Sequence, residues 1–128
     1  MDSDYERAEL LIGLADRVAG KKKLLNDYLD AAGRMSSDYE LARTLLALEK
    51  EGELDDEAAR KFLIVATGIS GDYEKGQVLS TMIPHCKGKV GLEDALAEAI
   101  DGINSDYERD QLYSRLYKEK RDSRKGSH

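Results

Sequence analysis

Ser37-Asp38-Tyr39-Glu40 is the stretch that decides the fold, because the chain returns to it at one fixed interval. The other copies are Ser3-Asp4-Tyr5-Glu6, Gly71-Asp72-Tyr73-Glu74 and Ser105-Asp106-Tyr107-Glu108, and successive tyrosines are 34 residues apart. We call these four-residue stretches the repeat motif. A strict period between about 20 and 50 residues is typical of proteins built from stacked structural repeats. We therefore expect four successive units, over residues 3–36, 37–70, 71–104 and 105–121.

The repeat motif has the residues of a helix N-terminus. In a capping box, a Ser hydroxyl accepts a hydrogen bond from the backbone amide three residues later, and a Glu at that position reaches back to the Ser amide. Ser3, Ser37 and Ser105 each have this Glu, whereas Gly71 lacks the hydroxyl. The Asp of each copy adds negative charge at the positive end of the helix dipole. A helix is therefore expected to start at every copy.

Each unit continues with the pattern of two helices. Apolar residues follow the motif with helical spacing, and after a turn at Gly20, Gly52 or Gly88 they recur at i, i+4, i+7 and i+8, which indicates a second helix and not a strand. The fourth unit has no second helix. We expect helices at about 3–17, 22–33, 37–51, 55–67, 71–84, 91–102 and 105–121, with Pro84 ending the fifth.

The expected fold is therefore all-α, a right-handed α-solenoid of about three and a half helix-turn-helix repeats, similar in build to HEAT or tetratricopeptide arrays. Residues 1–121 would form this single domain, and residues 122–128 a flexible tail. The last three residues, Gly126, Ser127 and His128, resemble a cloning remnant.

Composition narrows the possible partners. The chain of 128 residues has 20 basic and 26 acidic side chains and a net charge of −6, which argues against nucleic acid, because phosphate binding requires a basic surface. The sequence has no apolar run that approaches the roughly 20 residues needed to span a bilayer, and no signal peptide, so we expect a soluble chain without membrane insertion. It would be cytoplasmic or a domain of a membrane-associated protein, and the compartment stays open.

The repeat motif resembles the Ser-Asp-Tyr-Glu repeats of uncharacterised bacterial proteins and of the extramembrane parts of some beta-lactam-sensing membrane metallopeptidases. The resemblance covers residues 3 to 117 and rests on the motif and on the Leu-Leu-x-x-Leu-like run that follows it. It implies an array of helical hairpins. It does not imply the protease, because the sequence has only two histidines and no His-Glu-x-x-His.

The motif itself has two interpretations. A row of carboxylates and phenols could bind a peptide or cations, whereas in the structural interpretation Asp and Glu cap helices and Tyr packs between repeats. We favour the structural interpretation. The Asp, Tyr and Glu residues of the four copies would then form a ladder along the array, which consists of Asp4, Tyr5, Glu6, Asp38, Tyr39, Glu40, Asp72, Tyr73, Glu74, Asp106, Tyr107 and Glu108.

A second set of residues is expected on the outward face of the first helices. Glu9, Arg43, Gln77 and Gln111 form one row, and Gly13, Ala47, Thr81 and Arg115 lie one turn further on. Small residues bordered by long polar ones could form the floor of a groove for a partner helix or peptide, although a solvated face would have the same composition.

Catalytic patterns are weak. His85 and Cys86 are adjacent, and neighbours at a helix end cannot easily chelate one ion, so we expect Cys86 to be a small buried hydrophobic residue. The expected function is a non-catalytic module that binds a protein or peptide and needs no cofactor. The alternatives are a regulatory or sensor domain of a larger bacterial protein and, with least support, an enzyme on a helical scaffold. Self-association through the open ends of the array is a further expectation.

Overall fold

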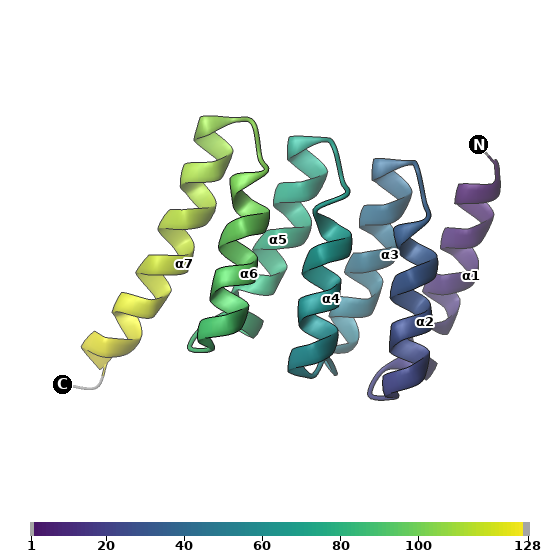
Figure 1. Cartoon of the computed structure of the whole chain (residues 1–128), viewed down its shortest axis with the longest axis horizontal. Helices are drawn as coiled ribbons and strands as arrows, with labels where there is room; N and C mark the ends of the chain where they lie inside the picture. The colour runs from purple at the N-terminus through teal and green to yellow at the C-terminus, as the bar shows by residue number, and fades with distance from the viewer. Residues whose placement is uncertain (1, 127–128) are drawn as a thin grey trace.

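The computed structural model describes residues 2–126, and side chains for residues 3–117. In that range the chain is all-α, with seven helices and no strand. The helices are α1 (Asp2–Val18), α2 (Lys22–Gly33), α3 (Asp38–Glu51), α4 (Asp56–Ala66), α5 (Asp72–Cys86), α6 (Val90–Asp101) and α7 (Asp106–Gly126) (Figure 1).

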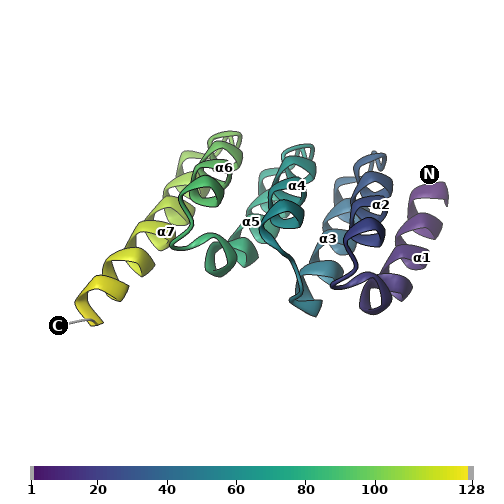
Figure 2. The ribbon, with the colours of Figure 1, turned by 60° about the horizontal axis from the view of Figure 1, so that its bottom comes forward.

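The helices lie in two layers. α1, α3, α5 and α7 form the first layer, in which each helix contacts the next, and α2, α4 and α6 form the second layer in the same way (Figures 1 and 2). Each helix therefore packs on the helix that follows it by one sequence period. The first turns of the first-layer helices, which hold the repeat motif, lie in a row along the upper edge of the molecule in Figure 1.

In the described residues the number and type of the helices are as expected, and most ends agree within one residue, but three ends bear on the expected cap, break and tail. α1 begins at Asp2, so Ser3 lies inside the helix and is not its N-cap. α5 continues past Pro84 to Cys86, because a proline in the last turn removes only one helical hydrogen bond, and the Lys87 amide still reaches the Ile83 carbonyl at 3.0 Å. α7 continues to Gly126, into the segment expected to be a tail.

The expected caps form where their side chains allow. Ser37 Oγ accepts from the Glu40 amide at 3.2 Å, Ser105 Oγ accepts from the Glu108 amide at 3.2 Å, and Gly71 leaves α5 without a side-chain cap. The three expected turn glycines, Gly20, Gly52 and Gly88, have φ values of 77°, 78° and 84°. This left-handed conformation is costly for other residues, which explains glycine there.

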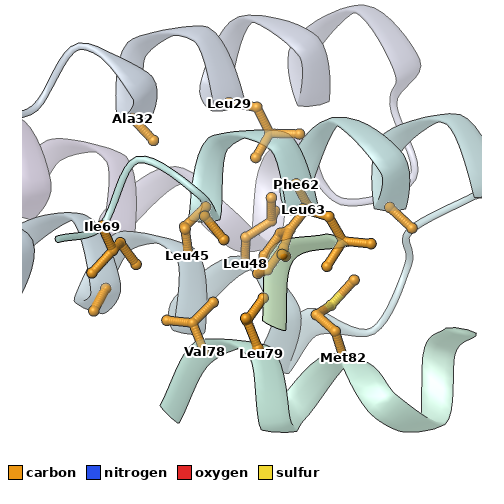
Figure 3. Packing of buried hydrophobic residues seen from close by; sticks show 14 of the residues in the cluster. Leu29, Ala32, Leu45, Leu48, Phe62, Leu63, Ile69, Val78, Leu79 and Met82 are labelled. Carbon is orange, nitrogen blue, oxygen red and sulfur yellow. The ribbon is translucent and has the colours of Figure 1, made fainter. Parts of the chain in front are cut away.

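The core lies between the two layers. Phe62 and Leu63 of α4 meet Leu48 of α3 and Leu79 and Met82 of α5, and all five are fully buried (Figure 3). Small residues bring the first-layer helices together, since Ala8, Ala42 and Gly76 are buried one turn after the motif tyrosines of the first three units. Within the described residues, none of the helices combines the length and the apolar character needed to cross a membrane.

Candidate functional site

The aspartate of the repeat motif ties each unit to the next. Asp4 Oδ2 accepts hydrogen bonds from the backbone amides of Ser36 and Ser37, both at 2.9 Å. The same pair of bonds recurs further along the chain, from Ser70 and Gly71 to Asp38 at 3.0 and 2.8 Å, and from Asn104 and Ser105 to Asp72 at 3.0 and 2.8 Å. We call this contact the aspartate clamp.

The aspartate clamp corrects the expected capping box. The Ser37 amide donates to Asp4 of the preceding unit, so it does not need Glu40 as an acceptor. The hydrogen bond from the Ser37 amide lowers the pKa of Asp4, although partial burial of this carboxyl acts in the opposite direction. Within the described residues no further unit follows α7, and Asp106, whose side chain is 86% exposed, pairs with Arg109.

The tyrosines of the motif are exposed. The exposed fractions of Tyr5, Tyr39, Tyr73 and Tyr107 are 54%, 63%, 68% and 73%, so the prediction that they pack between repeats is wrong. Helical side chains tilt toward the N-terminus of their helix, and a side chain in the first turn therefore extends beyond the contact between neighbouring helices. The residues that make this contact are the buried small residues one turn later.

Arg43 joins the first two tyrosines. Its guanidinium carbon lies 5.9 Å from the ring centroids of both Tyr5 and Tyr39, a distance suited to cation–π attraction. The guanidinium also donates to Glu9 Oε2 at 2.5 Å and to Glu40 Oε1 at 2.6 Å. These contacts, with Glu9 first, raise the pKa of Arg43, which is therefore a fixed positive charge between two aromatic rings.

The exposed tyrosines and the expected partner row belong to one surface. On each first-layer helix, the residues four and eight positions after the tyrosine lie on the same side as the tyrosine. We call this surface the tyrosine face. Every member is exposed or half-buried, and the members are Tyr5, Glu9, Gly13, Tyr39, Arg43, Ala47, Tyr73, Gln77, Thr81, Tyr107, Gln111 and Arg115.

The glutamates of the motif lie beside this surface. Glu6 is exposed, and Glu40, Glu74 and Glu108 are half-buried. A Glu108 carboxylate oxygen lies 3.1 Å from the position that a Cβ on Gly76 would occupy, so this side chain reaches from α7 to α5. Among residues 3–117, Glu74 and Glu108 form no ion pair, in contrast to Glu40.

The structure has a groove between α2 and α4 that the sequence analysis did not predict. Its volume is about 740 Å³, and its walls combine Leu25, Leu29, Ala58 and Ile64 with lysines at the rim. All three of these lysines are already paired, Lys22 with Glu57 at 2.9 Å, Lys23 with Asp27 at 3.1 Å and Lys61 with Asp30 at 2.6 Å. Ile64 is 64% exposed. An isoleucine on the polar side of α4 was the sequence signal that could have indicated the groove.

In the described residues, His85 and Cys86 do not form a catalytic or metal-binding cluster. His85 Nε2 lies 3.1 Å from Glu49 Oε2, and Cys86 is fully buried, as predicted. Burial raises the pKa of the Cys86 thiol to about 11, which disfavours the reactive thiolate. Across the part of the chain whose side chains are described, no group of three His, Cys, Asp or Glu residues is placed to hold a metal ion.

Comparisons with protein-family models, with curated proteins and with solved structures find no match to this chain. The resemblance of the repeat motif to bacterial Ser-Asp-Tyr-Glu repeats therefore stays a prediction, and the candidate site rests on its own geometry.

Proposed function

We propose that this chain is an interaction module that binds a peptide segment of a partner protein along the tyrosine face. The observation that carries the proposal is the repeated exposure of Tyr5, Tyr39, Tyr73 and Tyr107, each more than half exposed in the same turn of a first-layer helix. Tyrosine combines a large apolar ring with a polar hydroxyl and loses little conformational entropy on binding, so it is enriched in binding surfaces.

The fold that we propose for this function is a right-handed α-solenoid. Its support is the recurrence of equivalent contacts, in which α1, α3, α5 and α7 pack in order and α2, α4 and α6 pack in order. Such arrays present one continuous surface built from the same positions of successive units. An extended peptide could then contact several equivalent tyrosines at once.

Peptide display on the purified chain tests the proposal. We expect selected peptides to bind the wild type and to lose affinity for the triple variant Tyr39→Ala/Tyr73→Ala/Tyr107→Ala. The matched control is Leu10→Ala/Ile64→Ala, which removes two side chains that are each 64% exposed and lie outside the tyrosine face. Failure to select any peptide, or equal affinity for the triple variant, would contradict the proposed function.

A further inference from the structure

Arg43 shows how this surface holds a guanidinium group. Four side chains surround it, namely the rings of Tyr5 and Tyr39 at 5.9 Å and the carboxylates of Glu9 and Glu40. Two of these come from α1 and two from α3. The guanidinium therefore lies where two neighbouring first-layer helices each contribute one ring and one carboxylate.

The same position recurs between α5 and α7 without its arginine. Two periods of 34 residues separate Tyr5, Tyr39 and Glu40 from Tyr73, Tyr107 and Glu108, so both rings and one carboxylate are retained. Gln111 stands where the arginine would be, and Gln77 stands where Glu9 would be. The rings of Tyr73 and Tyr107 are the most exposed of the four, at 68% and 73%.

The charges around this position favour a cation. Glu108 reaches across to Gly76 of α5 and has no ion-pair partner within residues 3–117. Arg109 is engaged by Asp106 and by the Ile103 carbonyl, and Arg115 lies about 12 Å along α7 from Tyr107. The Gln77 amide oxygen can accept a hydrogen bond in place of the missing second carboxylate.

We propose that an arginine side chain of the partner peptide binds between Tyr73 and Tyr107, held by both rings and by Glu108. This inference rests on the proposed function and assigns the chemistry of its ligand. In it, the partner supplies the guanidinium that Arg43 supplies to the first two units.

The repeat distance of the surface suggests the form of a suitable probe. Packed helices lie about 8–10 Å apart. A polyproline II segment advances about 9 Å in each turn of three residues, so every third side chain would meet the next first-layer helix. A blocked peptide with the sequence Pro-Pro-Arg repeated three times therefore presents arginines at the required interval.

The experiment is an NMR titration of the isotope-labelled chain with this peptide and with its Pro-Pro-Gln counterpart. We expect chemical-shift changes at amides near Tyr73, Tyr107 and Gln111. We also expect the arginine peptide to bind at least about two- to fivefold more tightly than the glutamine peptide. This factor corresponds to a cation–π contact of about 0.5–1 kcal/mol at 1.4 kcal/mol per tenfold. Equal affinity for the two peptides, or shifts elsewhere, would overturn the assignment.

Two variants of the chain make the test specific. Gln111→Arg places an arginine next to Glu108, as Arg43 lies next to Glu40, and should block the arginine peptide. Glu98→Gln, on the exposed side of α6, changes the net charge by the same amount far from the site and should leave binding unchanged. Binding that persists in Gln111→Arg would overturn the proposal.

The outcome separates this inference from the proposed function. If display yields peptides that depend on the tyrosines but not on arginine, the peptide-binding function stands and the arginine site is wrong. If neither displayed peptides nor the arginine peptide bind, both proposals fail.

Discussion

Asp38 and Tyr39 are neighbours in the chain, but their side chains lie in different parts of the molecule. Asp38 accepts hydrogen bonds from the Ser70 and Gly71 amides of the next unit, whereas Tyr39 is 63% exposed and contacts Arg43. The aspartate therefore joins units, and the tyrosine belongs to the surface. The motif therefore combines an aspartate that contacts the next unit with a tyrosine that we propose takes part in recognition.

The aspartate clamp can be tested by comparing Asp38 with Asp106. We expect Asp38→Ala to lower the free energy of unfolding by about 1–3 kcal/mol, because two backbone amides lose a charged acceptor. Asp106→Ala should change it by about 0.5 kcal/mol or less, since Asp106 forms only an exposed ion pair with Arg109. Urea denaturation measures both, and equal losses would show that the clamp is not the stabilising contact.

Acid should weaken the clamp at Asp4. The hydrogen bond from the Ser37 amide lowers the pKa of Asp4. The charged carboxylate therefore stabilises the folded state fully at pH values above the ordinary Asp pKa of about 3.9. This stabilisation is lost as the pH falls through the lower pKa of the folded state. Wild type should therefore exceed Asp4→Asn in stability by a constant amount above about pH 5, and the difference should shrink below about pH 4. Denaturation curves between pH 2 and 7 measure this difference in stability. A difference that stays the same at every pH would contradict the prediction.

At the scale of the helices, the sequence was sufficient for most of the fold. Helix starts followed from Ser37 and Ser105, and the turns followed from glycines such as Gly52, because capping and left-handed φ are local properties. The prediction that Pro84 ends the fifth helix was wrong. The destabilisation that a proline causes depends on how many helical hydrogen bonds follow it, and α5 ends only two residues later.

The candidate site was less predictable. Tyr5 was expected to pack between repeats, yet it is exposed and only Ala8, one turn later, is buried, because the tyrosine extends past the contact between helices. The bonds from Ser36 and Ser37 to Asp4 join residues 32 and 33 positions apart, and such a contact cannot be read from local patterns. The signal for it was the aspartate retained in all four copies, including the copy in which Gly71 replaces Ser.

The packing of α5 predicts an unreactive thiol. Cys86 is fully buried, and its pKa is raised to about 11 by burial, with Glu93 as the next cause. At pH 8 we expect a disulfide reagent to label native protein at least about a hundredfold more slowly than denatured protein, because little thiolate is present and access requires opening of the fold. Similar rates in the two states would show that Cys86 is accessible.

For the whole molecule, two layers of helices arranged in a row should give an elongated particle. A compact domain of 128 residues has a radius of gyration of about 14 Å. We expect X-ray scattering of the monomer to give a larger value. A value at or below about 14 Å would indicate that the helices close into a globule in solution.

The central claim is that the tyrosines of the repeat motif serve recognition and do not hold the array together. The most direct test is the thermal melt of Tyr39→Ala/Tyr73→Ala/Tyr107→Ala. Exposed positions change stability by about 0.5 kcal/mol or less each, or about 1.5 kcal/mol for all three, so we predict a Tm within about 6 °C of the wild type. A buried ring would cost about 3–5 kcal/mol per site. A fall in Tm of more than about 10 °C, or loss of the folded state, would contradict this claim.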